Sequence, residues 1–451
     1  MGVDQKNLRI AINAQVPPGT GAGGIETVLL ALTVLSHLDD GAEEYVFVGH
    51  WGEPERLRPW LGARGRLVTG PAPALPEETR PARAEMLKRA LGPVRPAARY
   101  AKQRLRAFAS REAPSAPHTV NFFERLGCDV VHFPFQHYEP CGVPSVFNPH
   151  DLQHLHHPSF FDAAEIERRE SLYPAACRDA HTVIVASDFV RRDVMSRYGI
   201  ETDKVQVIPW APPPAPATQA DGDIVARTVR EKYFPADEPS ALYPAMTWEH
   251  KNHIRLLEAM ALLRDRDGLR VRLVCTGHRT DFFPRIERRL GELRLRDQVS
   301  FTGMLSYEEL CAVYRAAEFI VIPTLFEAAS APLFEAWQHG APVACASVTA
   351  LPEQAGGAAL MFDPTSVEAI ADAVGRMWAD AELREDLRRR GARRVKDFSP
   401  ERTAKAYRAV YRRAAGLTLG EEDRWLLTHD WTRGGVAAPT RYARTGVRLY
   451  A

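Results

Sequence analysis

The stretch "TLFEAASAPLFEAWQHGAPVACAS", residues 324–347, decides the fold class. It begins just after one short apolar run, carries a single helical pattern and ends in a second apolar run. Pro332 suits the first turn of that helix, and His339 followed by Gly340 suits its end. Short apolar runs joined by a helix are typical of strand–helix–strand units, whose strands are parallel. The stretch therefore predicts one unit of a parallel α/β sheet.

Apolar runs of the same kind recur along the chain in two sets of six. They predict two doubly wound, Rossmann-like α/β domains that face each other across a cleft. The first set occupies 8–14, 44–50, 129–134, 144–150, 181–187 and 204–210, and the second set occupies 240–246, 271–277, 298–303, 318–323, 342–347 and 358–363.

The regions around these two sets complete the predicted organisation. Residues 211–223 are rich in proline and polar residues, which indicates a linker between a first domain at 1–210 and a second at 224–398. A helical pattern at 399–416 has Ser399 as its expected N-cap and Pro400 in its first turn, and we expect it to pack back toward the first domain. The tail at 417–451 carries no interpretable motif.

The composition is that of a soluble globular enzyme, with 45% hydrophobic and 25% charged residues in 451. The 58 Lys and Arg residues almost cancel the 57 Asp and Glu residues, which argues against a dedicated nucleic-acid binder. The six scattered cysteines are interpreted as buried reduced thiols. No apolar run reaches the roughly 18 residues needed to span a bilayer, and the start lacks a secretory signal, so we expect a cytoplasmic protein.

Two glutamates in the opening stretch point to a ligand. Glu327 falls in a loop after a strand, and Glu335 is expected in the opening turn of the helix that follows. The unpaired N–H groups and dipole of a helix N-terminus suit a diphosphate, while carboxylates accept hydrogen bonds from sugar hydroxyls. Together these features indicate a nucleotide sugar. The alternative is that Glu335 only complements the helix dipole and Glu327 is an ordinary exposed loop acid.

The longer passage "FEAASAPLFEAWQHGAPVACASVTALPEQAGGAALMFDPTSVEAIADAV" resembles the signature of family 4 retaining glycosyltransferases of the GT-B fold. Glu327 and Glu335 take the two positions of that family's Glu-x7-Glu motif. The resemblance extends over about 8–415, and it implies that Glu327 lies by the donor sugar and Glu335 holds the ribose hydroxyls. The residues that open the helix are assigned to donor binding with them: Ser330, Ala331, Pro332 and Leu333.

One departure from the family pattern lies between the two glutamates. The usual Gly-Phe-Gly is replaced by residues Ala328, Ala329, Ser330 and Ala331, which leaves the backbone fewer conformations beside the donor.

A second motif, Lys251 and Asn252, resembles the Lys-Asn pair of the same family. A lysine here would offset the negative charge that builds on a departing diphosphate. Met246 stands where the family often has an arginine, so we expect Lys251 to act with His250 or with backbone N–H groups. We assign Asn252 and His250 to donor binding. The alternative, a solvated lysine at a helix start, is disfavoured because a cation opposes the helix dipole.

Two turns after strands of the second domain are weaker candidates for contacts with the phosphates and the base. They contribute Gly277 from "TGHRT" and Gly303 and Met304 from "FTGML".

In the first domain, a glycine-rich loop at 19–24 follows the opening strand. Glycines let a loop approach a ligand closely, and Gly23 and Gly24 match a pair that lies near the donor phosphates in the resembling family. His150 ends a strand, and in that family a histidine at the matching place contacts the donor sugar.

Metal binding was weighed at two places. The four histidines of "HDLQHLHH", 150–157, could form a metal cluster, but no cysteine or third-ligand pattern supports it. Asp151 more simply caps the short helix after it. The sequence "DRD", 265–267, resembles the divalent-metal motif of a different glycosyltransferase fold, and we interpret it as a solvated turn. We therefore expect no required metal and no cofactor beyond the co-substrate.

A basic insertion occupies about 75–117. Its part at 80–111 holds ten Lys or Arg residues against one acid, interleaved with apolar side chains. Such a segment could lie on an anionic membrane or simply face water.

The sequence thus predicts a retaining, metal-independent glycosyltransferase that moves a hexosyl unit from a nucleoside diphosphate sugar to an acceptor hydroxyl. Lys251, Glu327 and His150 are the predicted catalytic residues. The acceptor could be a carbohydrate, a lipid-linked sugar or a small molecule. The alternatives are a nucleotide-sugar epimerase or a phosphorylase of the same architecture, and a non-catalytic nucleotide-sugar-binding partner.

Overall fold

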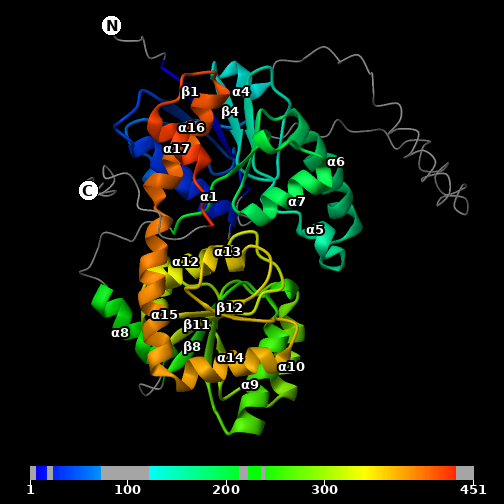
Figure 1. Cartoon of the computed structure of the whole chain (residues 1–451), viewed down its shortest axis with the longest axis vertical. Helices are drawn as coiled ribbons and strands as arrows, with labels where there is room; N and C mark the ends of the chain where they lie inside the picture. Colours follow the sequence, from blue (N-terminus) through cyan, green and yellow to red (C-terminus); the bar gives the residue numbers. More distant parts are fainter. Residues whose placement is uncertain (1–6, 18–23, 73–120, 213–221, 235–238, 433–451) are drawn as a thin grey trace, which may run out of the picture.

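The computed structural model describes residues 7–17, 24–72, 121–212, 222–234 and 239–432. Two parallel sheets form two α/β bodies, one above the other in Figure 1, which confirms the predicted fold class. Gly23, most of the linker at 211–223, the basic segment at 80–111 and the end of the tail from 433 lie outside the described residues.

The first sheet has seven strands in the order β3-β2-β1-β4-β5-β6-β7, all parallel. Each of the six predicted runs contains one strand, but β3 was not predicted. It is an edge strand whose side chains are at least partly exposed, so it lacks the apolar run of a buried strand. The strands are β1 (Arg9–Ala14), β2 (Glu44–Gly49), β3 (Gly65–Thr69), β4 (Val130–Phe133), β5 (Ser145–Phe147), β6 (Thr182–Val185) and β7 (Val205–Val207).

The second sheet has six parallel strands in the order β10-β9-β8-β11-β12-β13, one in each predicted run. Strand order reverses between β1 and β4 in the first sheet and between β8 and β11 in the second. Ligands of such sheets bind at these switch points, outside the carboxyl ends of the strands. The strands are β8 (Ser240–Pro244), β9 (Arg272–Thr276), β10 (Val299–Phe301), β11 (Phe319–Ile322), β12 (Val343–Ala346) and β13 (Leu360–Phe362).

Helices connect the strands and cover the sheets (Figure 1). The first body has α1 (Gly24–Thr33), α4 (Phe122–Arg125), α5 (Gln153–His156), α6 (Ala163–Asp179) and α7 (Asp188–Tyr198). The second has α8 (Gly222–Tyr233), α9 (His253–Asp267), α10 (Phe283–Glu292), α11 (Tyr307–Ala316), α12 (Ala331–Gln338), α13 (Leu351–Ala355), α14 (Val367–Ala379) and α15 (Ala381–Arg394). Single 3-10 turns lie at η1 (Val34–His37), η2 (Arg58–Trp60), η4 (Pro158–Phe160), η5 (Thr202–Lys204), η7 (Glu249–Lys251) and η8 (Val395–Asp397).

The chain returns to the first body through α16 (Pro400–Ala414) and α17 (Glu421–Thr428), which lie beside β1 in Figure 1. Ser399 caps α16 by accepting a hydrogen bond from the Arg402 N–H. The buried rings of Tyr407 and Tyr411 belong to the same apolar core as β1 and β2. Tyr411 also bonds the buried His132 of β4, with 2.8 Å between its hydroxyl oxygen and Nδ1. The C-terminal helices are therefore part of the first body's core.

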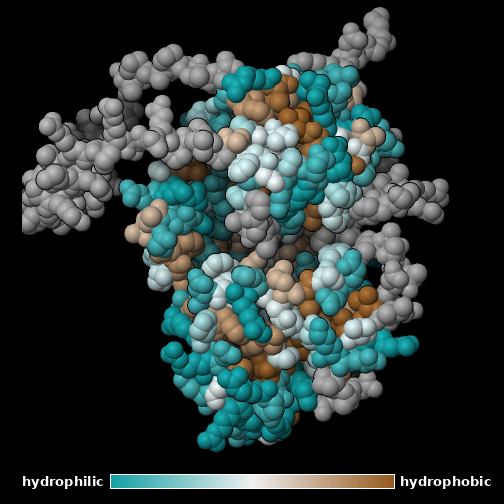
Figure 2. Space-filling view, turned by 180° about the vertical axis from the view of Figure 1, so that it is seen from behind, coloured by the Kyte–Doolittle hydropathy of each residue, from teal (hydrophilic) through white to brown (hydrophobic). Residues whose placement is uncertain are grey.

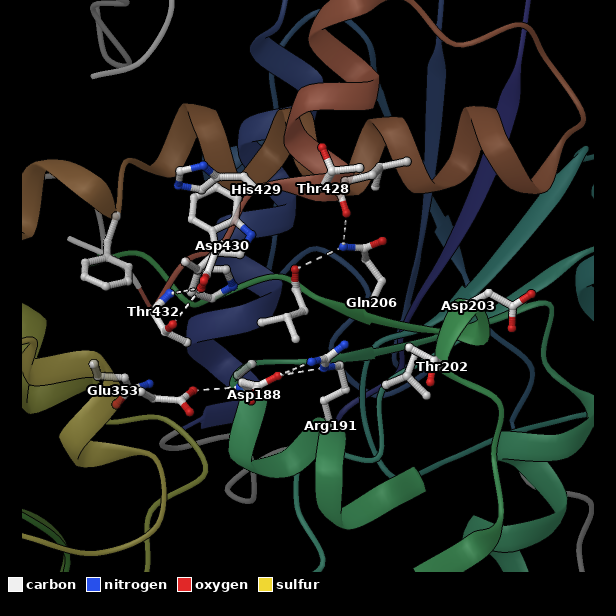
Figure 3. Close-up of a pocket in the computed structure, with 18 of the residues that line it drawn as sticks. Asp188, Arg191, Thr202, Asp203, Gln206, Glu353, Thr428, His429, Asp430 and Thr432 are labelled. Carbon is white, nitrogen blue, oxygen red and sulfur yellow. Dashed lines mark hydrogen bonds and ion pairs between the residues drawn. The ribbon is translucent and has the colours of Figure 1, made fainter. Parts of the chain in front are cut away.

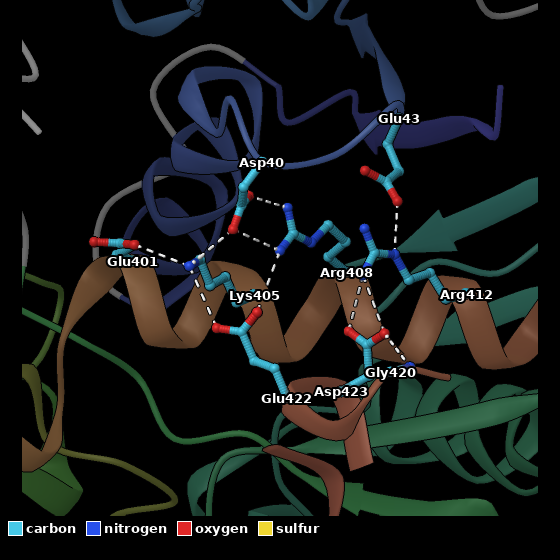
Figure 4. A network of polar contacts seen from close by, with 9 residues as sticks. All are labelled: Asp40, Glu43, Glu401, Lys405, Arg408, Arg412, Gly420, Glu422 and Asp423. Atoms are coloured by element: carbon cyan, nitrogen blue, oxygen red, sulfur yellow. Dashed lines mark hydrogen bonds and ion pairs between the residues drawn. The ribbon is translucent and has the colours of Figure 1, made fainter. Parts of the chain in front are cut away.

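Ion pairs reinforce this return, and Figure 4 shows them as one network. The guanidinium of Arg408, whose side chain is 1% exposed, contacts Asp40 at 2.5 Å, and Lys405 contacts the same carboxylate at 2.9 Å. Arg412 joins Glu43 at 2.7 Å and Asp423 of α17 at 3.0 Å. We call these contacts the α16 ion-pair network.

The surface of the second body is mainly hydrophilic at the end farthest from the first, and the outline narrows where the two bodies meet (Figure 2). Within the described ranges, no helix has both the length and the apolar character needed to cross a membrane.

Candidate functional site

The carboxyl ends of the two sheets face each other. Phe160 of the first body lies near His250, which follows β8, with 6.2 Å between ring centroids. Phe326, which follows β11, packs edge-on against Phe189 of α7 at 6.1 Å. Glu353 of α13 accepts a hydrogen bond from the Asp188 N–H at 2.7 Å. The segments that follow strands in each sheet therefore meet between the bodies.

Lys251 and Glu327 come together at the switch point of the second sheet. Lys251 lies in η7 after β8, Glu327 follows β11, and these two strands are neighbours. The ammonium nitrogen lies 2.6 Å from the Glu327 Oε1, and the two side chains are only 20% and 10% exposed. Two residues that are 76 positions apart thus form a partly buried ion pair where a ligand is expected.

Asn252 holds together the loops that carry Lys251 and Glu327. Its backbone is left-handed, with φ of 63°, and its side-chain amide donates to the carbonyls of Pro323 and Pro364, both at 2.8 Å. The Leu325 N–H donates to the carbonyl of His250 at 2.8 Å. Because its amide hydrogens bond one carbonyl after β11 and one after β13, Asn252 joins the loops after β8, β11 and β13. The structure thus gives it a supporting role that the sequence prediction of donor contact did not include.

His250 is held neutral beside the ion pair. Burial, together with the positive charge of Lys251, holds the pKa of His250 well below its ordinary value. A neutral imidazole can donate one hydrogen bond and accept another.

The helix after Glu327 begins one residue earlier than predicted. α12 starts at Ala331, with Ser330 as N-cap in extended conformation and Pro332 in the second helical position. Proline is tolerated there because the N–H groups of a first turn have no helical partner. Glu335 is the fifth residue of α12, so the prediction that it lies in the opening turn was wrong. No acidic residue lies in that turn, which leaves the positive end of the helix for an external anion.

The side chain of Glu335 instead contacts α11. The Tyr314 hydroxyl donates to the Glu335 Oε2 at 2.7 Å, and burial raises the pKa of the carboxyl while this hydrogen bond opposes the rise. The dipole-complement alternative fails, because the carboxylate lies beyond the first turn.

The other residues assigned to the start of α12 differ in what they can offer. The side chain of Leu333 is fully buried in the second core, so its assignment to donor binding stays a prediction that could concern only its backbone. Ser330 is also fully buried, and its N–H donates to the Gln354 Oε1 at 3.1 Å. Ala331 and Pro332 are partly exposed at the helix end.

Gly277 and Gly303 join the turns after β9 and β10. The Gly277 N–H donates to the Gly303 carbonyl at 2.9 Å, and both glycines have positive φ, 114° and 79°. A Cβ on Gly277 would lie 2.6 Å from the carbonyl oxygen of Ala245, so only glycine fits there. Met304 follows with 61% of its surface exposed.

The first body supplies a separate cluster. A Cβ on Gly24 would lie 2.4 Å from the ring of Trp210, so the start of α1 touches the end of the first domain. His150, with φ of 65°, lies near the same ring at 6.2 Å, and its Nε2 is 2.7 Å from the Pro134 carbonyl. His150 and Gly24 thus share Trp210 as a neighbour, and among the described residues no hydrogen bond or ion pair joins them to Lys251 or Glu327.

The histidines after β5 have different partners. His154 pairs with Glu170 at 2.8 Å and His156 with Asp193 at 2.7 Å, so they do not converge on one point. The N-cap of α5 is Leu152, so the prediction that Asp151 caps this helix was wrong by one residue; the Asp151 carboxylate accepts from the Gln153 N–H at 2.9 Å. The "DRD" sequence lies in the last turn of α9 rather than in a loop, and its aspartates pair with neighbouring arginines.

Three contributors were missed by the sequence interpretation: Glu353, Gln354 and Tyr314. The first two belong to the Pro-Glu loop that was quoted within the family signature but given no role. Tyr314 carried no signal, because a helical tyrosine in an apolar pattern is typical of a core residue.

A cavity of about 460 Å³ lies between the bodies on the side of α13 that faces α7 and α17 (Figure 3). α7, β7, α13 and α17 contribute to its walls, and Asp188, Arg191, Gln206, Glu353 and His429 are among its lining residues. Neither Lys251 nor Glu327 lines it.

Comparisons with known proteins agree with this geometry. Residues 22–211 match the family described as Glycosyltransferase Family 4, and residues 226–394 match Glycosyl transferases group 1. The chain is 28% identical over 275 residues to O-antigen chain mannosyltransferase B of Escherichia coli, covering 58% of this chain and 69% of the relative. It is 26% identical over 252 residues to alpha-D-kanosaminyltransferase of Streptomyces kanamyceticus, covering 54% of this chain and 64% of that relative.

Two solved structures show the same fold. Sucrose-phosphate synthase from Thermosynechococcus elongatus has a TM-score of 0.62 at 22% identity, and the match covers 90% of this chain and 99% of that one. HepE from Anabaena, in complex with UDP and glucose, has a TM-score of 0.62 at 14% identity with the same coverage.

Proposed function

Because the chain belongs to the family 4 and group 1 glycosyltransferases of the GT-B fold, we propose that it transfers a hexosyl unit from a nucleoside diphosphate sugar to an acceptor hydroxyl, with retention of configuration. The observation that carries the proposal is the Lys251–Glu327 ion pair, at the switch point of the second sheet and beside the start of α12. A positive side chain and a helix N-terminus are the groups that would stabilise a departing diphosphate, which supports the proposal.

Charge on the leaving group would be stabilised without a metal. The Lys251 ammonium and the N-terminus of α12 would supply positive potential at the diphosphate, and the low exposure of Lys251 would strengthen its contribution relative to water. The neutral His250 could donate one further hydrogen bond. The enzyme would therefore keep its activity in the presence of a chelator.

The remaining side chains would position the donor. Tyr314 holds the Glu335 Oε2, and the proposal assigns the Oε1 to the ribose hydroxyls. Glu327 would keep Lys251 in place and, with His150, orient the sugar. The leaving phosphate would take the acceptor proton on the same face, so no protein nucleophile is required.

The acceptor would bind against the first body, whose loops would complete the site. One relative is named as an O-antigen chain mannosyltransferase, which supports a carbohydrate as the acceptor class, and another is named for the transfer of a kanosaminyl unit. Hexoses linked to UDP, GDP or dTDP form the first donor panel.

A thermal-shift screen across these nucleoside diphosphates and their sugars tests the assignment, since a ligand held by the folded state raises the melting temperature. Glu335→Ala should abolish the shift that the best ligand gives, while Glu382→Ala, at an exposed site on α15 of the same body, should keep it. Lys251→Ala should lower kcat by about 100-fold, as expected for a group that stabilises charge in the transition state.

The products decide the reaction class. NMR of the fresh product should show the donor's anomeric configuration, and EDTA should leave the rate unchanged. Inversion would refute retention, and loss of activity with EDTA that added Mg²⁺ restores would refute metal independence. A donor altered without acceptor would indicate an epimerase instead.

A further inference from the structure

Glu353 bridges the two bodies in an unusual way. It belongs to α13 of the second body, and each of its carboxylate oxygens accepts one backbone N–H from the first turn of α7 in the first body. The Asp188 N–H lies 2.7 Å from Oε1 and the Phe189 N–H 3.1 Å from Oε2. Figure 3 shows the carboxylate directed at the start of α7. The next N–H, that of Val190, is satisfied by the Ser187 hydroxyl of the helix itself.

Burial raises the pKa of Glu353, and the two backbone hydrogen bonds at the start of α7 oppose that rise. The first N–H groups of a helix have no partner within it, and the positive end of the helix dipole attracts an anion. Hydrogen bonds to an ionised acceptor are stronger than neutral ones. The side chain of Asp188 does not compete for these N–H groups, since it pairs with Arg191 at 2.6 Å.

The same contact is connected to the candidate catalytic residues. The Thr349 Oγ1, just before α13, accepts the Glu327 N–H at 2.9 Å and donates to the Glu327 carbonyl at 2.6 Å. The Ala350 N–H donates to that carbonyl as well, at 3.2 Å. Gln354, next to Glu353, holds the Ser330 N–H at the start of α12. The segment 349–354, which contains most of α13 and the two residues before it, thus holds both Glu327 and the N-cap of α12.

Apolar contacts also join α7 to the segment that carries Glu327. Phe326, next to Glu327, is 3% exposed and belongs to the first body's core cluster, although it comes from the second sheet. Its ring packs against Phe189, the residue whose N–H Glu353 accepts, and against His156 at 5.5 Å.

We propose that Glu353 is a positioning residue, which clasps the N-terminus of α7 and thereby sets the Lys251–Glu327 pair and the start of α12 for transfer. The proposal rests on the proposed function, because it assigns those groups to catalysis. When the clasp opens, α13 loses its anchor in the first body, and the Glu327 backbone that it holds becomes free to shift. Donor binding within the second body would be retained, while turnover would fall.

Hydrogen exchange tests the clasp without any substrate. In the full chain, Glu353→Ala should speed exchange of the Asp188 and Phe189 amides by about 10-fold or more, because local opening exposes them to water. Glu353→Gln keeps one acceptor oxygen and should give an intermediate rate. Glu382→Ala should leave exchange in 186–192 unchanged. Equal exchange in wild type and both Glu353 variants would overturn the clasp.

Kinetics then test positioning. With the donor found above, Glu353→Ala should lower kcat by about 10- to 100-fold, the cost of a small misplacement of reacting groups, while affinity for the matching nucleoside diphosphate stays within about 3-fold. Glu353→Gln should recover part of kcat. Faster exchange with kcat within 2-fold of wild type would reduce Glu353 to a structural contact. If wild type binds no nucleoside diphosphate, the proposed function fails, but the exchange result still decides whether the clasp exists.

Discussion

Glu335 is a single residue whose proposed binding role requires an ionised carboxylate, while the stability of the fold disfavours that charge. The proposed function assigns its carboxylate to the ribose hydroxyls of the donor, but burial raises its pKa, so the ionised form is disfavoured in the folded state. A carboxyl whose folded pKa lies above its unfolded value destabilises the fold as pH rises through those two values. The cost is absent in acid and complete at neutral pH.

Glu335→Gln should therefore stabilise the protein at neutral pH. The amide oxygen can still accept from Tyr314, while the buried charge is gone. We expect the melting temperature at pH 7.5 to rise by about 2 °C, the change that roughly 1 kcal/mol produces in a domain of this size, with no rise at pH 4. Affinity for the nucleoside diphosphate should fall in the same variant. A lower melting temperature at pH 7.5 would contradict this account.

At the scale of elements, the α16 ion-pair network attaches the C-terminal helix to the first body. Burial alone would raise the pKa of Asp40, but the hydrogen bonds and charges of Arg408 and Lys405 hold it well below its ordinary value. Arg408 is almost fully buried, so loss of this partner leaves a desolvated cation whose other carboxylate, Glu422, is 3.9 Å away.

Asp40→Asn should therefore destabilise the protein by about 2 kcal/mol in urea unfolding, because an uncompensated buried charge costs more than an exposed pair contributes. The matched control is Glu44→Gln, which removes the partner of Arg9 in an exposed pair and should change stability by at most about 0.5 kcal/mol. Equal effects of the two variants would show that the network does not anchor α16.

At the scale of the whole molecule, buried histidines make both bodies sensitive to acid. Burial lowers the pKa of His132 in the first body and of His253 in the second to about 3. Below pH 6.5, near the ordinary pKa of histidine, the unfolded chain binds a proton at each of these two histidines, whereas the folded chain does not. Stability is therefore lost as pH falls, by about 1.4 kcal/mol per pH unit for each histidine.

His253→Phe should remove one of these contributions. No hydrogen-bond partner for either ring nitrogen is found among the described residues, and the ring packs against Tyr243, so an aromatic replacement fits the site chemically. Between pH 6.5 and 5, the free energy of unfolding should fall by about 2 kcal/mol less than in the wild type. An unchanged pH dependence would show that His253 is not protonated on unfolding in this range.

The sequence predictions succeeded where a feature depends on residues close together in the sequence, and they failed where it depends on its surroundings in the fold. The apolar runs fixed the two parallel sheets, because a strand buried on both faces must be apolar along its length. The edge strand β3 was not predicted, because its side chains are at least partly exposed and it has no continuous apolar run. The glutamate spacing identified Glu327 and Glu335, but the start of α12 was misplaced by one residue, which moved Glu335 out of the first turn.

By itself, the sequence determined the fold class, the two sets of strands, the capped C-terminal helix and the residue types of the candidate site, because all of these depend on local pattern. Only the tertiary structure decided which of those residues meet. The Lys251–Glu327 pair joins neighbouring strands across a switch point, and the Glu353 clasp joins two bodies, with 76 and 165 positions between the partners. No local periodicity encodes such contacts, since they arise from the order of the strands and from the way the two sheets face each other.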